Sequence, residues 1–221
     1  MNTMKLLALD TSTDSCSVAL LIGDSVYGKT ILQARKHNEL IIPTIDELLK
    51  EHQIGLESID YFACGVGPGS FVGVRLGVSV IQGLAFAVDK PVIAFSSMSA
   101  VAAMVMEKEK LNCIQVGLDA RMDDVYYGHY LKKDDGVIET IIERSVASNV
   151  LQLDQKTPDL VGDGFKQIAL QVHKLHEAGA LSLRFIMPTL LAQVKSNQVL
   201  VEVEKLQPVY LQGNKNWKQR S

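Results

Sequence analysis

Apolar runs and apolar residues at helical spacing define the elements of the first half of the chain. Short apolar runs bounded by turn residues are typical of buried strands, whereas apolar residues three or four positions apart are typical of helices. Pro43 falls within a helical stretch, where it fits the first turn or a little beyond. The first half is predicted to contain strands over 5–10, 16–23, 26–32, 59–66 and 91–95 and helices over 39–52 and 71–88.

The second half repeats part of this pattern. Asp10 ends a strand and precedes a polar turn and a second strand, and Asp119 does the same in the second half. A repeated order of strand, aspartate, turn and strand indicates an internal duplication. The second half is predicted to contain strands over 116–119, 125–131 and 137–146, helices over 165–178 and 189–197, and a closing segment over 199–211.

Two βββαβα-like halves are typical of the actin-like ATPase (ASKHA) fold, an α/β fold that binds nucleotide phosphates between two lobes. We expect a first lobe over residues 1–105, joined by part of the C-terminal segment, and a degenerate second lobe over 106–211. The polar residues 212–221 are expected to form a flexible tail. Fold alone does not assign a function.

Composition and charge limit the classes of function that are open to the chain. Its 221 residues carry a net charge of −3, whereas a protein that grips a nucleic-acid backbone by itself usually has an excess of Lys and Arg. Two uncharged stretches, between Arg75 and Asp89 and between Lys90 and Glu107, are shorter than the roughly 20 residues that cross a bilayer. No signal peptide is recognisable. A soluble, cytoplasmic protein is therefore expected.

The strongest local signal is a glycine-rich motif, GVGPGSFVGVRLG, over residues 65–77. Gly67 and Gly69 permit a tight turn from strand to helix, and Pro68 stiffens that turn. Ser70 suits the N-cap of the helix that follows. Backbone N–H groups at such a helix start can bind an anion. The alternative is a turn with a helix cap and no ligand.

A cleft beside this motif is expected to contain two aspartates and two arginines. Asp10 and Asp119 can each accept N–H groups of the turn that follows, so they are predicted to tie the turns together, with Arg121. Arg75 is either a phosphate or carboxylate contact, or an ion-pair partner for Asp10 or for a residue of the turn. The residues assigned to the cleft are Asp10, Thr11, Ser12, Gly67, Pro68, Gly69, Ser70, Arg75, Asp119 and Arg121.

The two helices of the first half are apolar on more than one side. One sheet covers only one stripe of a helix, so apolar area is left over for a partner interface. Gly73 and Gly77 stand four apart and are expected to invite close approach of a facing helix, and Ile41 is taken as exposed. The residues assigned to this interface are Leu40, Ile41, Thr44, Ile45, Leu48, Gly73, Val74, Gly77, Val80, Ile81 and Leu84.

The histidines do not assemble into a metal site. His173 and His176 stand three apart on the helix expected over 165–178, a spacing compatible with a metal ion, but no third ligand has an obvious claim to join them. The sequence also lacks a GxSxG nucleophile motif and a Walker A motif. No catalytic residue and no metal ligand is therefore assigned.

Several segments, taken together and in this order, resemble the TsaB (YeaZ) family. The similarity extends from the N-terminus to Leu211, is specific up to about residue 130, and is looser afterwards. The segments that carry it are LALDTST at 7–13, KHNELIIPTIDELL at 36–49, the glycine-rich motif at 65–77, LDARMDDVYY at 118–127 and PVYL at 208–211.

This resemblance implies a two-lobed actin-like fold and a role in making threonylcarbamoyladenosine at the adenosine 3′ of the tRNA anticodon. Members of the family are similar to the catalytic subunit TsaD, pair with it through a helix bundle and work with the ATPase TsaE. The threonylcarbamoyl-adenylate donor comes from a separate synthase. The resemblance thus implies a non-catalytic scaffold that reaches tRNA through the complex and can form a homodimer when TsaD is absent.

Comparison with the catalytic relative suggests that the cleft is vestigial. The metal-binding HMEGH segment of TsaD is replaced here by Ser97-Met-Ser-Ala-Val101, in which neither end residue offers a nitrogen ligand. No cofactor is expected to bind stably, and ATP or ADP is expected at most weakly, at the cleft or in the complex. Two other functions are possible for such a chain: an autonomous ATPase or small-molecule kinase of the same fold, and a metalloprotease, which the missing ligands disfavour.

Overall fold

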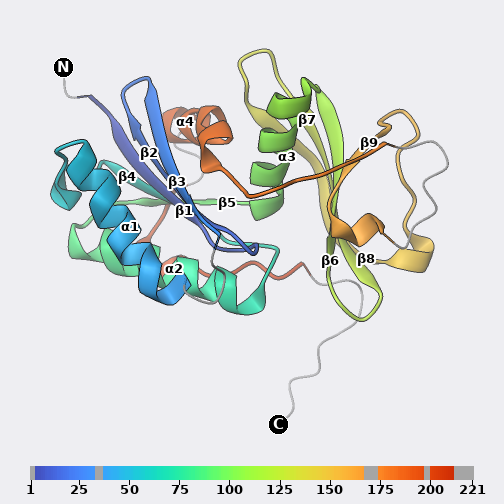
Figure 1. The fold of residues 1–221 in the computed structure, drawn as a ribbon, viewed down its shortest axis with the longest axis horizontal. Coiled ribbons are helices and arrows are strands. Elements are labelled where there is room, and N and C mark those ends of the chain that lie inside the picture. The colour runs from blue at the N-terminus through green and yellow to red at the C-terminus, as the bar shows by residue number, and fades with distance from the viewer. Residues whose placement is uncertain (1–2, 33–36, 167–173, 197–199, 212–221) are drawn as a thin grey trace, which may run out of the picture.

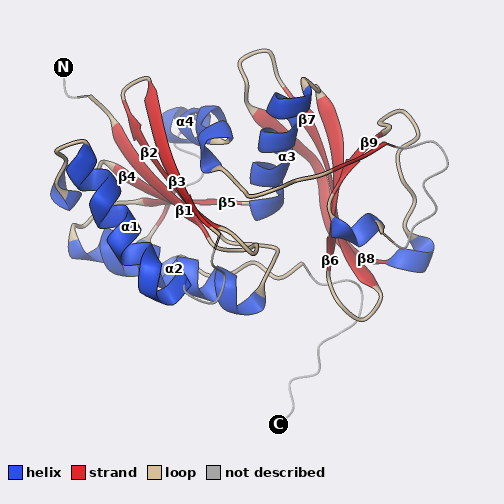
Figure 2. Cartoon of the chain, in the orientation of Figure 1, coloured by secondary structure: helices blue, strands red, loops and turns tan. Residues whose placement is uncertain are grey.

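The computed structural model describes residues 3–32, 37–166, 174–196 and 200–211, which form two mixed sheets with helices around and between them (Figures 1 and 2). The first sheet has the strand order β11-β5-β4-β1-β2-β3. Its strands are β1 (Lys5–Asp10), β2 (Cys16–Ile22), β3 (Ser25–Ile31), β4 (Tyr61–Gly65), β5 (Val92–Phe95) and β11 (Leu200–Val201).

The second sheet repeats the topology of the first, with the strand order β10-β9-β6-β7-β8. In both sheets the first strand is antiparallel to the second and parallel to the fourth. This repetition confirms the internal duplication and the α/β actin-like fold. The strands are β6 (Cys113–Asp119), β7 (Asp124–Lys132), β8 (Ile138–Ala147), β9 (Asp159–Val161) and β10 (Lys174–His176).

The α-helices lie in two different layers. Helices α1 (His37–Glu51) and α2 (Phe71–Ala87) cover the outer face of the first sheet, whereas α3 (Ser97–Glu109) lies between the two sheets (Figure 1). Helix α4 (Met187–Ser196) packs in the same core as α3. No helix of the described ranges is long and apolar enough to cross a membrane.

Side chains along β1 alternate between the two faces of the sheet, and this alternation divides the hydrophobic core in two. Leu7 and Leu9 face α1 and α2 in one cluster, whereas Leu6 and Ala8 face α3 and the second sheet in the other. The second cluster continues into β6 and β7, through side chains such as Val116. The two halves of the chain therefore share one continuous core around α3.

The connections of the second half are shorter than those of the first. Within the described residues, β8, β9 and β10 are connected through 3-10 turns at Ser148–Val150 and Asp163–Phe165 and not through α-helices. The helix predicted over 165–178 is therefore wrong at its C-terminal end, where Lys174–His176 is strand β10, paired in parallel with β9 as the fifth strand of the sheet. Its middle, 167–173, lies outside the described residues.

The closing segment contains little regular structure. Only Leu200–Val201 pairs with β5, and the strand then gives way to a 3-10 turn at Val203–Lys205. Pro208 has no N–H group to donate to a sheet, which agrees with the irregular backbone around it. The predicted tail over 212–221 lies outside the described residues.

Candidate functional site

Asp10, at the end of β1, is the centre of the predicted cleft and is fully buried. Its Oδ1 accepts hydrogen bonds from Ser12 N at 2.8 Å and from Ser12 Oγ at 2.6 Å. Its Oδ2 accepts one from Ser97 Oγ at 2.6 Å. Both carboxylate oxygens are therefore occupied by neighbouring side chains and backbone.

The surroundings of Asp10 leave no room beside its carboxylate. A Cβ added at Gly65 would lie only 1.8 Å from Asp10 Oδ2, so glycine is required on the adjacent strand β4. Burial raises the pKa of Asp10 above its usual value, and the hydrogen bonds from Ser12 and Ser97 lower it in part. The carboxylate is a structural acceptor in this arrangement and is not presented to a ligand.

Ser97, which the sequence did not assign to the cleft, connects three segments. Its Oγ donates to Asp10 and also accepts a hydrogen bond from Gly67 N at 3.2 Å, and its own N–H donates to Gly67 O at 2.9 Å. Ser97 begins α3, and Ser96 before it caps the helix by accepting from Ser99 N. The replacement of a ligating histidine by Ser97 was visible in the resemblance, but its contact with Asp10 was not.

The glycine-rich motif forms the predicted strand-to-helix turn and packs directly on the turn after β1. Ser70 N donates to Ser12 O at 2.7 Å, and Ser70 Oγ accepts from Gly73 N as the N-cap of α2. A Cβ at Gly69 would lie 2.5 Å from Ser12 O. The turn-and-cap interpretation accounts for these contacts, because the neighbouring backbone fills the space beside the turn.

Gly73 and Gly77 face the chain's own turn, which corrects the expectation that they invite a facing helix. A Cβ at Gly73 would lie 2.0 Å from Thr11 O, and a Cβ at Gly77 would lie 2.5 Å from Thr11 Oγ1. Thr11 Oγ1 also donates to Gly73 O at 2.6 Å. The two glycines therefore let the turn after β1 approach α2.

Arg75 does not belong to the cleft and does not pair with Asp10, so that part of the expectation is wrong. Its guanidinium carbon lies 3.3 Å from the centroid of the Phe71 ring and 5.4 Å from that of Tyr210. Arg75 is exposed, on the side of α2 that faces the C-terminal segment. Because of this position on α2, the Arg75 side chain points away from Asp10.

Asp119 repeats the geometry of Asp10 at the end of β6. Arg121 N donates to Asp119 Oδ1 at 2.8 Å, two residues on, as Ser12 N does to Asp10. Asp119 is exposed, and the Arg121 side chain lies 3.7 Å from it. The prediction that both aspartates accept N–H groups from the following turn is confirmed. The turn is tight, since Arg121, Met122 and Asp123 all have positive φ.

Several residues assigned to the partner interface lie within the chain's own core. Ile41, expected to be exposed, has an exposed fraction of 0%, because it points from α1 onto the sheet. Leu40, Thr44, Gly73, Val80 and Leu84 are partly exposed. The buried members of the set are Ile41, Ile45, Leu48, Val74, Gly77 and Ile81.

The outer surface of these helices carries other apolar side chains, which the sequence analysis did not select. Ile42 on α1 is 49% exposed, and Val72 and Phe86 on α2 are 72% and 68% exposed. Ile41 and Ile42 are adjacent and equally apolar, so the sequence pattern does not decide which of them faces the sheet. Only the position of the sheet decides it.

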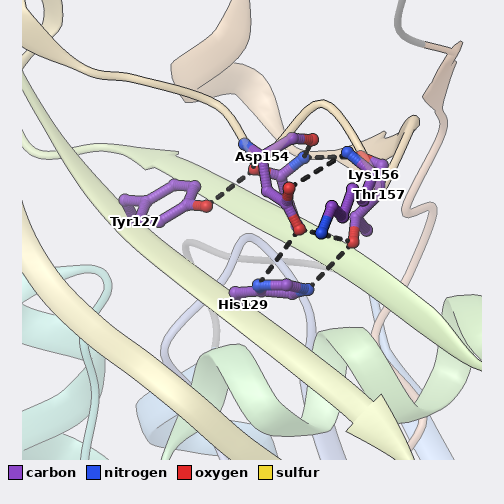
Figure 3. Close-up of polar contacts among 6 residues, drawn as sticks. Tyr127, His129, Asp154, Lys156 and Thr157 are labelled. Carbon is purple, nitrogen blue, oxygen red and sulfur yellow. Dashed lines mark hydrogen bonds and ion pairs between the residues drawn. The ribbon is translucent and has the colours of Figure 1, made fainter.

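A second polar cluster, drawn in Figure 3, holds the loop before β9 against β6 and β7. Tyr127 Oη donates to Gln115 Oε1 at 2.6 Å, and Gln115 Nε2 donates to Thr157 O at 2.6 Å. Thr157 Oγ1 lies 3.0 Å from both Asp154 Oδ2 and His129 Nε2. Thr157 is only 4% exposed, so its hydroxyl fixes the loop and is not placed to attack a substrate.

His176 is also a structural residue. Its Nε2 lies 2.6 Å from Asp159 Oδ1 and its Nδ1 lies 3.3 Å from Glu109 Oε2, so it connects β10 to β9 and α3. His173 lies outside the described residues. In the part of the chain that is described, no three His, Cys, Asp or Glu side chains are arranged to hold a metal ion.

Known proteins are similar to this chain in sequence and in fold. A family model described as TsaD, tRNA N6-adenosine threonylcarbamoyltransferase, matches residues 31–200. Proteins described as tRNA threonylcarbamoyladenosine biosynthesis protein TsaB are 35% identical in Haemophilus influenzae (99% of this chain, 98% of the relative) and 30% identical in Escherichia coli (97% of each). The solved structure described as YeaZ from Pseudomonas aeruginosa superimposes with a TM-score of 0.85 at 30% identity, covering 94% of this chain and all of that one. The chain belongs to the TsaB (YeaZ) family.

Proposed function

We propose that this chain is the non-catalytic partner subunit of the complex that transfers threonylcarbamoyl from threonylcarbamoyl-adenylate to the adenosine 3′ of the tRNA anticodon. In this proposal it forms a heterodimer with TsaD, cooperates with the ATPase TsaE and meets tRNA as part of the complex. The relatives named for this biosynthesis and the match to the TsaD family model support the pathway.

The observation that carries the non-catalytic role is the contact between Ser97 and Asp10. By resemblance, Ser97 and Val101 stand where TsaD has its two metal-ligating histidines. Here the Ser97 hydroxyl is committed to Asp10 and Gly67 N, and Val101 is 3% exposed within the core. A serine in two hydrogen bonds and a buried valine offer a metal no nitrogen ligand. The scaffold is therefore retained without the chemistry of the catalytic relative.

The outer face of α1 and α2 is the surface that we propose for TsaD. Partly exposed Leu40, Val80 and Leu84 from the predicted set combine there with the more exposed Ile42. A contiguous exposed apolar surface on two paired helices is typical of a protein–protein interface. The same face would form a homodimer when TsaD is absent, because a two-fold dimer uses one patch on both copies.

Nucleotide binding by the isolated chain is proposed to be weak or absent. Asp10 sits where the actin-like fold places phosphates, yet its oxygens are occupied by Ser12 and Ser97. A cation or water that linked Asp10 to a phosphate would have to displace these donors from a buried site. ATP or ADP would then bind mainly in the assembled complex.

Reconstitution with purified components tests the proposed role. Threonylcarbamoyl transfer to tRNA is measured in three reactions, all supplied with threonylcarbamoyl-adenylate. The first contains this chain alone, the second contains TsaD and TsaE without this chain, and the third contains all three proteins. We expect no transfer by the chain alone and a strong increase when it is added to TsaD and TsaE. Transfer by the chain alone, or no effect of adding it, would contradict the proposal.

A further inference from the structure

A groove separates α2 from the C-terminal segment, on the side of the helix where Arg75 lies. Its volume is about 520 Å³. It is lined by Arg75, Val78, Ser79, Gln82, Leu206, Gln207, Pro208 and Tyr210.

The walls of this groove are held in place by hydrogen bonds at both ends. Gln82 Nε2 donates to Val203 O at 3.1 Å and to Leu206 O at 2.9 Å. Val209 N donates to Val66 O at 2.8 Å, next to the glycine-rich turn. The C-terminal segment is thus tied to α2 and β4, and a ligand would meet a preformed site, which lowers the cost of binding.

Arg75 is held in one orientation by two aromatic rings, and within the described residues it has no acidic partner. The guanidinium lies over the Phe71 ring and near the Tyr210 ring, whose centroids are 6.1 Å apart. Stacking occupies the face of a guanidinium and leaves the N–H groups in its plane available. None of the ion pairs among the described residues includes Arg75.

A planar guanidinium with free in-plane donors best matches a carboxylate or phosphate, which can accept two parallel hydrogen bonds. Two features favour a carboxylate from a protein. Among the described residues, Arg75 is the only cationic side chain that lines the groove, whereas a nucleic-acid backbone is usually held by several. The exposed rings of Phe71 and Tyr210 beside it also provide apolar contact area, as at protein interfaces.

We propose that this groove binds a segment of a partner protein in which an Asp or Glu carboxylate pairs with Arg75 and a neighbouring apolar side chain packs on Phe71. The site goes beyond the TsaD contact proposed above and does not depend on it, since it uses the C-terminal side of α2 and not the surface that α2 shares with α1. The chain would then offer two separate docking surfaces.

A pair of blocked dipeptides tests this site on the full-length chain. N-acetyl-Glu-Leu-amide and N-acetyl-Gln-Leu-amide are titrated while the Nε–H signals of the arginine side chains are followed by NMR. We expect the Glu peptide to shift the Arg75 signal in a saturable way, and the Gln peptide to bind at least roughly tenfold more weakly, because a hydrogen bond to a charged group is lost.

Two variants separate the proposed pairing from general charge effects. Arg75→Lys keeps the charge but loses the planar fork, so we expect the Glu peptide to bind more weakly and to lose part of its advantage over the Gln peptide, as followed by backbone amide shifts. Arg144→Lys is the control, because Arg144 also lies near an aromatic ring, 5.7 Å from the Tyr127 centroid, but outside the groove. This control should leave binding of the Glu peptide unchanged.

Three outcomes would overturn the proposal. The first is equal binding of the Glu and Gln peptides, and the second is unchanged binding of the Glu peptide by Arg75→Lys. The third is an Arg75 signal that shifts only with a single-stranded RNA oligonucleotide, which would make the site an RNA contact. TsaD binding is measured separately, so failure here leaves the proposed function standing, and failure of TsaD binding leaves this site standing.

Discussion

Ser97 Oγ donates a 2.6 Å hydrogen bond to Asp10 Oδ2, across 87 positions of sequence, and so joins the start of α3 to the end of β1. Because Ser97 Oγ also accepts from Gly67 N, one hydroxyl holds the strand, the glycine-rich turn and the helix together. Ser97 is therefore part of the framework of the fold.

Removing this hydroxyl should destabilise the chain. Ser97→Ala leaves Gly67 N and one oxygen of Asp10 without their partner in a buried site. We expect a loss of about 1–3 kcal/mol in the free energy of unfolding, measured with urea. Ser99→Ala is the matched control on the same turn, because Ser96 O keeps a hydrogen bond from Ala100 N. An equal or larger loss in the control would contradict the role given to Ser97.

Two glycines of α2 should respond to alanine in opposite directions. A Cβ at Gly73 would meet the backbone oxygen of Thr11 at 2.0 Å, so Gly73→Ala should cost about 1–3 kcal/mol through strain. A Cβ at Gly83 would meet nothing within 4 Å, so Gly83→Ala should stabilise the helix by roughly 0.5–1 kcal/mol. Thermal unfolding of both variants checks the signs. A neutral or stabilising effect of Gly73→Ala would show that the contact with Thr11 is not restrictive.

Asp154 should make stability depend on pH in the acid range. The pKa of its carboxyl is lowered, first by the hydrogen bond from Lys156 N and then by that from Thr157. A lowered pKa contributes stability above the unfolded pKa, near 4, and this contribution is lost as the pH falls through the folded value. The stability difference between wild type and Asp154→Asn should therefore be present above about pH 5 and shrink below about pH 4. A difference that persists unchanged to pH 3 in urea titrations would be contrary evidence.

Asp119 should behave as a turn residue and not as a catalytic acid. Asparagine can still accept the hydrogen bond from Arg121 N, so Asp119→Asn should leave the melting temperature and the tRNA modification of the reconstituted complex unchanged. The isolated wild-type chain should hydrolyse no ATP above a protein-free control with magnesium. Detectable hydrolysis that Asp119→Asn abolishes, at an unchanged melting temperature, would favour the autonomous ATPase.

Much of the fold could be predicted from the sequence because its signals are local. Apolar runs locate the strands of the first half, and the repeated aspartate at 10 and 119 indicates the duplication that the matching strand orders confirm. Helix α3 gave no periodic signal, since all ten residues from Ser97 to Met106 are buried between the two sheets. A helix surrounded by protein lacks the polar face that a sequence pattern needs.

The site could be predicted only as far as local chemistry determines it. The aspartates accept from the N–H two residues on, and a short-range rule of this kind can be read from sequence. The contact of Thr11 with Gly73, and the rotation that buries Ile41 and exposes Ile42, depend on how α1 and α2 settle on the sheet. Such tertiary contacts cannot be predicted from the residues nearby in the sequence.

The central claim, that the chain acts by docking its α1–α2 face on TsaD, is tested most directly by one matched pair of variants. Ile42→Arg and Ile141→Arg alter side chains that are 49% and 50% exposed, the first on α1 and the second on β8 of the other sheet. Each is mixed with TsaD and analysed by size-exclusion chromatography with light scattering, after circular dichroism has confirmed folding. An arginine buried without a partner opposes association, so Ile42→Arg should lose the heterodimer while Ile141→Arg retains it. An undiminished heterodimer with Ile42→Arg would contradict the account.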